Sequence, residues 1–374
     1  MSKTGKVFIR LAVAAAAVPV LFAVSLALPI PAWRTGRLPV PPLPVVENGP
    51  RIKAPDRVWV DTDAACGVER RADPDDCFAL MLLARAPDIE IVGVSTVFGN
   101  AKLEMTDRTT RRLASKLREA GTRLPAVHRG AGAPSASSTP AQDALRRALA
   151  DRPLTLVALG PLTNIAAALE GRPDLQANVV RIVAVMGRRP GHIFHPSEGN
   201  GEGMLFGHGP IFRDLNFDKD RKAATRVLSM GLPLSLIPYD VAREVSLKRF
   251  DLDQIARSGM AGAWIASRAQ GWLEFWKEEI GRDGFHPFDL LAAAYVLDPY
   301  LFNCAAANAW VGKDEHLSNV WFYDPVALQV GGTKKHPADP LAETEAIYCV
   351  TANAALRDRL MDGLAGMDRQ ASTD

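Results

Sequence analysis

Five carboxylates gather around one loop near the start of the globular part of the chain. Asp61 and Asp63 end a short apolar run, and Asp73, Asp75 and Asp76 follow about ten residues later, directly before an apolar segment. Carboxylates this close repel one another unless a cation neutralises them or some are protonated. Oxygen ligands without Cys or His suit a hard ion, Ca²⁺ or Mg²⁺. The loop therefore predicts a metal site, although helix caps and solvated loop charges would explain the same residues taken alone.

Short β-type runs alternate with longer helical patterns from residue 57 onward. Strands are predicted at 57–63, 89–100, 154–164, 178–187 and 233–241, and helices at 75–86, 106–121 and 217–231. This order implies an α/β fold, an open and mostly parallel sheet with helices on both faces and a Rossmann-like core. Ligands of such sheets lie beyond the C-terminal ends of the strands.

Polar or small residues stand where these predicted strands end. Asp63, Asn100, the segment 160–164 (GPLTN), Met186 and Asp240 each take such a place. Because the C-terminal ends of parallel strands meet at one edge of the sheet, these residues are expected to share a site.

The order of several motifs resembles a known family. These are VDTD…DPDDCFALMLLA, IEIVGVSTVFGN, LTLVALGPLTNIAAAL, VMG, FRDLNFDKDRKAA, PLSLIPYDV and DLLAAAYVLDPYLF. From about residue 57 to 365 the chain is similar to the inosine–uridine-preferring nucleoside hydrolases. The resemblance implies hydrolysis of the N-glycosidic bond of ribonucleosides, or of related N-ribosides, with a bound Ca²⁺ and with ribose and a free base as products.

The resemblance also implies roles for individual residues. The ion would be held by Asp63, Asp76, Asp289 and the main-chain carbonyl of Leu159. Asp63 would also be the general base that takes a proton from the attacking water. The predicted ribose contacts are Asp75, Asn100, Asp214, Asn216 and Asp289, with Met186 on the 5′ side of the sugar. Asp61 would orient the loop and the ligands.

Three departures from the family pattern bear on these roles. The loop between the two acidic motifs carries an extra ACGVERRA, residues 65–72. Asp214 stands where the family usually has Glu, and its side chain is one methylene shorter. Phe288 precedes Asp289 where many purine-cleaving members have a His that protonates the leaving base. His286, two residues earlier, or His208 could supply that proton instead, or aromatic stacking could activate the base.

An aromatic helical pattern offers contacts for the base. Trp272 and Trp276 share one helical face with Phe275, so Trp272 or Trp276 could stack on the base, while ordinary core packing explains most of these residues.

The N-terminus differs in kind from the rest. A basic flank, residues 1–10, precedes residues 11–31, whose first twenty positions carry no charge and would span a bilayer as a helix. An uncleaved signal-anchor and a removable signal peptide both fit, and both place the domain on the non-cytoplasmic side, periplasmic or extracellular. Residues 32–56 are rich in proline and predict an extended linker, and residues 57–370 form the nucleoside hydrolase-like domain.

The cysteines and the overall charge add further expectations. Cys66 and Cys77 bracket the acidic loop, and either a disulfide or two buried thiols would fit them. A formal net charge of +2 indicates no nucleic-acid partner. The expected partners are a small nucleoside, a membrane through residues 11–30, and further copies of the chain in a homo-oligomer.

Two other functions compete with a nucleoside hydrolase. A protein of the same fold could bind Ca²⁺ and a nucleoside or ribose with little turnover, which the missing His and the shorter Asp214 favour. A phosphatase with an aspartyl nucleophile also begins with a strand and DxD, but it gives the GPLTN segment no role.

Overall fold

A computed structural model gives the structure of the chain and describes residues 45–46, 56–136, 138–190, 192, 214–314, 326–331 and 340–366. The predicted membrane segment 11–30 and His208 lie outside these residues. Within the described ranges, no helix combines the length and the hydropathy needed to cross a membrane.

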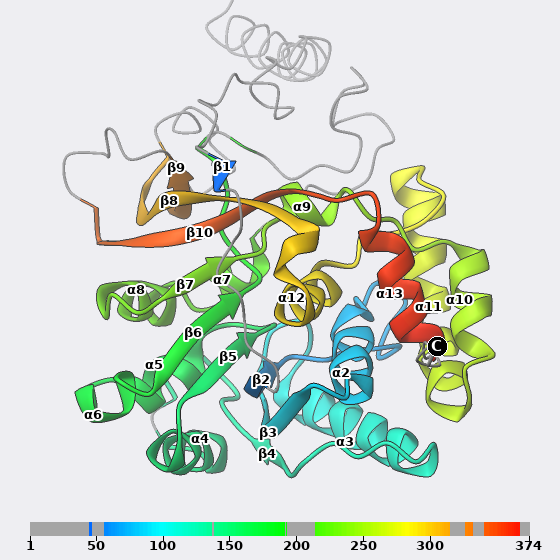
Figure 1. Cartoon of the computed structure of the whole chain (residues 1–374), viewed down its shortest axis with the longest axis horizontal. Helices are drawn as coiled ribbons and strands as arrows, with labels where there is room; N and C mark the ends of the chain where they lie inside the picture. Colours follow the sequence, from blue (N-terminus) through cyan, green and yellow to red (C-terminus); the bar gives the residue numbers. More distant parts are fainter. Residues whose placement is uncertain are drawn as a thin grey trace, which may run out of the picture.

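One open sheet of ten strands forms the centre of the described part of the molecule (Figure 1). Its order is β1-β8-β10-β7-β6-β5-β2-β3-β4, and β9 pairs with β8. The strands are β1 (Val45–Val46), β2 (Asp56–Thr62), β3 (Ile89–Thr96), β4 (Val127–Arg129), β5 (Leu154–Ala158), β6 (Val179–Ala184), β7 (Leu234–Leu236), β8 (Phe302–Lys313), β9 (Val326–Gly331) and β10 (Ala342–Ala352). Neighbours from β4 to β10 pair in parallel, whereas β8 pairs antiparallel with β10, β9 and β1. The predicted open α/β sheet is confirmed, with an antiparallel edge that makes it mixed.

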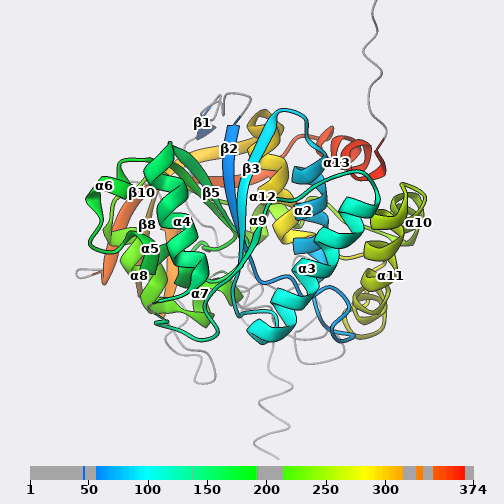
Figure 2. The ribbon, with the colours of Figure 1, turned by 90° about the horizontal axis from the view of Figure 1, so that it is seen from below.

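Helices cover both faces of this sheet (Figure 2). They are α2 (Asp75–Arg85), α3 (Leu103–Glu119), α4 (Pro140–Asp151), α5 (Thr163–Leu169), α6 (Pro173–Gln176), α7 (Leu215–Lys219), α8 (Arg221–Ser229), α9 (Tyr239–Ala242), α10 (Arg249–Ala256), α11 (Met260–Phe275), the π-helix η2 (Trp276–Ile280), α12 (Phe288–Leu297), the 3₁₀-helix η3 (Pro299–Leu301) and α13 (Leu356–Ala365). Two apolar cores result, one against α2, α11, α12 and α13 and the other against α4, α5 and α8.

Burial on all sides explains why β5, α2 and α12 consist mostly of apolar residues. Every residue of β5 is buried, as are the residues from Asp75 to Leu83 in α2. Helix α12 packs on α2 and is buried from Asp289 to Val296. Such elements show little amphipathic alternation because both of their faces touch protein. The carboxylates of α2 and α12 stand in the first turn of each helix, where the site forms.

The structure differs from the sequence predictions at three places. Val45–Val46, inside the predicted linker, pairs antiparallel with β8 at the edge of the sheet. The predicted helix 217–231 divides at Asp220, whose side chain caps α8 by accepting from the Ala223 N–H. The predicted strand 233–241 ends at Leu236, and its last residues form α9.

All four cysteines form disulfides. Cys66 is bonded to Cys77 with a Cα–Cα distance of 6.4 Å, so the bridge considered from the sequence is present. Cys304 is bonded to Cys349 across the β8–β10 pair, where the two residues stand opposite each other. The second bridge is not apparent from the sequence because its cysteines are 45 residues apart.

Gly93 in β3 permits the packing of Trp59, and its replacement is expected to destabilise the fold. A Cβ at Gly93 would lie 2.2 Å from the Trp59 Cζ3 atom, and Trp59 is buried. Gly93→Ala should lower the free energy of unfolding by about 1–3 kcal/mol in urea titration, the range for an overpacked core. Gly132→Ala is the control, because its Cβ would meet Leu103 at an ordinary 3.4 Å. Equal stability of the two variants would contradict this packing.

Candidate metal and substrate site

A cavity of about 300 Å³ opens at the C-terminal edge of the parallel strands. Its walls come from the segments that follow β2, β3, β5, β6 and β7, together with α7, α11 and the start of α12. Residues remote in sequence therefore share one depression, as expected for ligand sites in such sheets. Of the predicted site residues, the cavity is lined by Asp75, Asn100, Leu159, Met186, Asp214, Asn216, Trp272 and Asp289.

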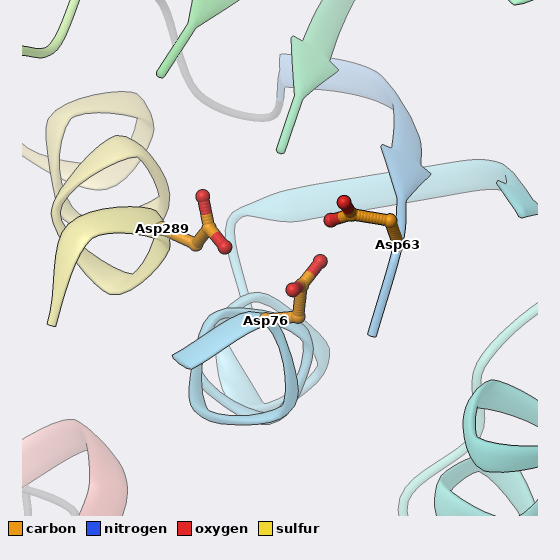
Figure 3. Close-up of side chains that lie close together, drawn as sticks. All are labelled: Asp63, Asp76 and Asp289. Atoms are coloured by element: carbon orange, nitrogen blue, oxygen red, sulfur yellow. The ribbon is translucent and has the colours of Figure 1, made fainter. Parts of the chain in front are cut away.

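Three buried carboxylates converge beside this cavity. Asp63, Asp76 and Asp289 each offer an oxygen, and these oxygens lie within 4.8 Å of one another. Figure 3 shows the three side chains pointing toward a common space from the end of β2, the start of α2 and the start of α12. The structure thus brings together the side-chain ligands predicted for a single ion.

Two helix N-termini meet at the carboxylates. Asp76 lies in the first turn of α2 and Asp289 in the first turn of α12. Asp75 joins the two helices, because its Oδ2 accepts from the Asp289 N–H at 2.8 Å and its Oδ1 from the Asp76 N–H at 3.0 Å. The positive end of each helix dipole favours negative charge at this place.

Close backbone contacts orient Asp63. Its Oδ2 accepts from the Asn100 N–H at 2.7 Å, and the Asn100 Nδ2 lies 3.4 Å from both Asp63 Oδ1 and Asp76 Oδ2. A Cβ at Gly99 would stand 1.8 Å from Asp63 Oδ2, so only glycine leaves room for the carboxylate there. The loop after β3 therefore fixes the rotamer of Asp63, which directly follows β2.

The GPLTN segment, residues 160–164, supports the site through hydrogen bonds of the Asn164 side chain. The Asn164 Nδ2 donates to Asp61 Oδ1 at 2.8 Å, and the Ser95 Oγ donates to the same oxygen at 2.5 Å. The Trp59 Nε1 donates in turn to Ser95 Oγ at 2.8 Å. Asp61 is buried and does not line the cavity, so its contacts link β2, β3 and α5 in support of the loop.

Burial and mutual repulsion raise the pKa of the acidic residues. Desolvation raises the pKa of Asp61 and of Asp76 to about 7. A hydrogen bond from Ser95 lowers the pKa of Asp61, and one from Thr62 lowers that of Asp76, but neither offsets the burial. Burial first, then repulsion from neighbouring carboxylates, raises the pKa of Asp63 and Asp289 well above the usual range. Protein contacts alone therefore leave the charged forms unfavourable, and a divalent cation would relieve this.

The donor set fits a hard divalent ion. The grouped ligands are carboxylate oxygens, all buried, and no His or Cys joins them among the described residues. The Leu159 carbonyl, predicted as a further ligand, accepts from the Asn216 Nδ2 at 2.7 Å and keeps a second lone pair. Oxygen-only sites of this kind suit Ca²⁺ or Mg²⁺.

Two of the predicted ribose residues, Asp214 and Asn216, form the cavity wall beside the segment that follows β6. Asp214 Oδ2 accepts from the Gly187 N–H at 2.7 Å, and burial raises the pKa of Asp214 to about 7. The Asn216 Nδ2 also donates to the Val185 carbonyl at 3.0 Å, which leaves its Oδ1 for a hydroxyl group. Met186 also lines the cavity.

Two of the predicted base contacts lie away from the cavity. The His286 Nδ1 stands 2.8 Å from the Val245 carbonyl, and burial lowers the pKa of His286 to about 4. Trp276 is fully buried, with its ring 4.9 Å from that of His286. Of the three candidates in the described residues, only Trp272 lines the cavity: it belongs to α11, whereas Trp276 begins η2.

Other lining residues were missed from the sequence. Tyr239 and Phe288 line the cavity with their rings 6.0 Å apart, and Arg71 and Lys219 line it as well. The strand-end rule pointed instead to Asp240, which is buried, does not line the cavity and pairs with Arg189 at 2.7 Å. Since α9 begins at Tyr239, a strand boundary placed correctly would have found it.

The chain matches one family model over residues 58–333, described as inosine-uridine preferring nucleoside hydrolase. A pyrimidine-specific ribonucleoside hydrolase, RihA, from Salmonella agona (strain SL483) is 24% identical over 268 residues, which are 64% of this chain and 81% of that protein. RihA from Klebsiella pneumoniae (strain 342) is 25% identical over 270 residues, with the same coverage of 64% and 81%.

Solved structures share the fold. A plant nucleoside hydrolase, PpNRh1, matches with a TM-score of 0.64 at 19% identity, covering 83% of this chain and 98% of its own. A purine-preferring ribonucleoside hydrolase from Gardnerella vaginalis matches with a TM-score of 0.64 at 18% identity, covering 83% and 99%.

The raised pKa values predict how the stability of the metal-free protein depends on pH. A carboxyl group whose pKa is higher in the folded than in the unfolded state makes folding less favourable as pH rises between the two values. For Asp61, Asp76 and Asp214 this window runs from 3.8 to about 7. One such group should lower the free energy of unfolding by about 2 kcal/mol between pH 5.5 and pH 8.

Urea titration of chelator-treated protein at the two pH values measures this effect. Saturating Ca²⁺ should reduce the loss, because the ion favours the ionised carboxylates. A metal-free protein that becomes more stable from pH 5.5 to pH 8 would contradict the electrostatic description of the site.

Proposed function

Since the chain belongs to the inosine-uridine preferring nucleoside hydrolase family, we propose that it hydrolyses the N-glycosidic bond of ribonucleosides with one Ca²⁺ held in its acidic site. The products are ribose and a free base. The observation that carries the proposal is the convergence of the Asp63, Asp76 and Asp289 oxygens within 4.8 Å. The side chains of these residues and the Leu159 carbonyl would hold the ion, which supplies the positive charge that makes water a stronger acid.

Asp63 is the general base of this proposal. It is buried, its carboxylate is fixed by the Asn100 main chain at 2.7 Å, and it faces the other two carboxylates. A base held in one rotamer takes a proton from water without first losing side-chain freedom. Neutralisation of the neighbouring charges would return Asp63 to its ionised form, which a base requires.

The wall of carboxylates and amides stabilises the sugar as it gains positive charge. Asp75, Asn100, Asp214 and Asn216 line the cavity around the space that a ribose would fill. Their orientations are set by main-chain hydrogen bonds, such as Gly187 N–H to Asp214, so little reorganisation accompanies the reaction. Oxygens placed in this way bind an oxocarbenium-like sugar more tightly than the neutral nucleoside.

Aromatic residues form the proposed base pocket. Trp272, Tyr239 and Phe288 line the cavity, and the first of these approaches from α11. Stacking holds a flat base and positions its bond to the sugar. His286 is neutral at pH 7 and directed to the Val245 carbonyl, so the proposal gives it no proton-donating role.

The proposed location of the domain is outside the cytoplasm. Two disulfides support this location, because such bonds persist in oxidising compartments. The uncharged run at 11–30 supports it from the sequence, as a signal-anchor or as a signal peptide.

The first test of the proposal is release of ribose. The protein should release free ribose from inosine, uridine or a chromogenic N-riboside, and a chelator should stop the reaction. Asp63→Ala should lower kcat by at least about 10²-fold, the lower range for loss of a general base, while circular dichroism shows a folded protein. Asp174→Ala is the control, because this carboxylate is 60% exposed, pairs with the nearby Arg172 and does not line the cavity.

The outcomes distinguish an enzyme from a binding protein. Full activity of Asp63→Ala would remove Asp63 as the base. Tight calcium binding with no ribose released from any of the three substrates would replace the hydrolase with a protein that binds nucleosides.

Trp272 tests the base pocket. Trp272→Leu should raise KM by about 10-fold or more with a smaller change in kcat, because loss of one aromatic contact costs about 1–1.5 kcal/mol beyond its area. Trp276→Leu is the matched variant: it should lower the free energy of unfolding and leave KM near wild type, since Trp276 does not line the cavity. Equal KM values for the two variants would contradict this assignment.

A further inference from the structure

A disulfide closes the loop between two of the grouped carboxylates. Cys66 lies three residues after Asp63, and Cys77 directly follows Asp76. The two cysteines are bonded, 11 residues apart in sequence, and both are buried. The bridge therefore connects the loop that follows β2 to the first turn of α2.

The same loop contains residues 65–72, the segment that departs from the family pattern. Its outer part lies on α11 and η2: Arg70 pairs with Glu278, and Arg71 pairs with Glu279. The Arg70 and Arg71 side chains are 45% and 65% exposed, and exposed ion pairs contribute little to stability. The buried covalent bond is consequently the stronger restraint on the inner part of the loop.

Repulsion works against the arrangement that this bond restrains. Asp63 and Asp76 raise each other's energy when both are charged, and Asp75 and Asp289 add to the repulsion. Without a cation, separation of the end of β2 from the start of α2 would relieve it. A cross-link three residues from one carboxylate and one residue from the other limits that separation. The site then stays close to the geometry in which an ion binds.

We propose that the Cys66–Cys77 disulfide is a positioning element of the metal site, which holds Asp63 and Asp76 together before the ion arrives. The proposal rests on the proposed function, because it requires that the carboxylates bind a divalent ion. Removal of the bond leaves both carboxylates in the chain but lets them move apart, so it weakens metal binding more than it disturbs the fold.

The second disulfide is a natural control. Cys304 and Cys349 are direct partners in the antiparallel β8–β10 ladder, where main-chain hydrogen bonds already hold the two strands in register. Neither cysteine lines the cavity. Its loss should affect stability and not the affinity for the ion.

Calcium titration by calorimetry at 25 °C tests the proposal with three oxidised proteins: wild type, Cys66→Ala/Cys77→Ala and Cys304→Ala/Cys349→Ala. The first double variant should bind Ca²⁺ at least about 10-fold more weakly, as when a residue that supports metal ligands is lost. The second should bind within about twofold of wild type. Excess Ca²⁺ should restore kcat in the first variant, because its catalytic residues are intact.

Reduction provides a second measurement on one folded chain. In Cys304→Ala/Cys349→Ala, a phosphine reductant cleaves only Cys66–Cys77 and should reproduce the loss of affinity, with folding monitored by circular dichroism. This comparison also serves if Cys66→Ala/Cys77→Ala fails to fold. The same reductant should not change calcium binding by Cys66→Ala/Cys77→Ala, which controls for its effect on the ion.

Three results would overturn the proposal. Wild-type affinity in Cys66→Ala/Cys77→Ala, or in the reduced control variant, removes the positioning role and leaves the proposed hydrolase intact. Equal weakening in both double variants assigns the effect to general stability. Absence of calcium binding by wild type removes the proposed metal site and this inference together.

Discussion

Repulsion among buried carboxylates is the interaction that the surrounding structure must balance. Asp63, Asp76 and Asp289 are buried and place oxygens within 4.8 Å of one another. The burial of ionised carboxylates costs free energy unless a cation pairs with them. The surrounding protein supplies partial positive charge through main-chain N–H groups and two helix N-termini, but no side-chain cation lies within ion-pair distance of these three among the described residues.

The sheet topology determines which parts of the chain share the site. Parallel pairing of β3, β2, β5, β6 and β7 brings five strand ends to one edge, and α12 reaches the same edge by packing on α2. The main chain at Gly99 passes close to the Asp63 carboxylate, and the absence of a side chain there leaves room for it. Asp61 and Asn164 then join neighbouring elements below the cavity. Each contact acts on a different element, so the carboxylates are held from several sides.

Much of this arrangement could be predicted from the sequence, for physical reasons. Apolar runs followed by polar or small residues located β2, β3, β5 and β6, and the oxygen-only ligand set indicated a hard ion. The base pocket was less predictable. Helical spacing cannot decide which of Trp272 and Trp276 faces the cavity, because that depends on how α11 packs and continues into η2. His286 was a plausible donor by sequence distance alone, whereas its bond to the Val245 carbonyl depends on tertiary contacts. The strand-end rule failed at Asp240 because β7 ends at Leu236, five residues before the end of the predicted strand 233–241.

The account depends on one divalent ion shared by carboxylates from three elements, and its stoichiometry is the most direct measurement. Calorimetric titration of chelator-treated protein with Ca²⁺ should give one site per chain, with protons released at pH 7 as the carboxyl groups ionise. The same titration of Asp289→Asn should show affinity lower by about 10-fold or more, since the neutral amide replaces one of the three grouped charges. Wild-type affinity in Asp289→Asn, or no binding by the wild-type chain, would contradict the convergence of these side chains on a single ion.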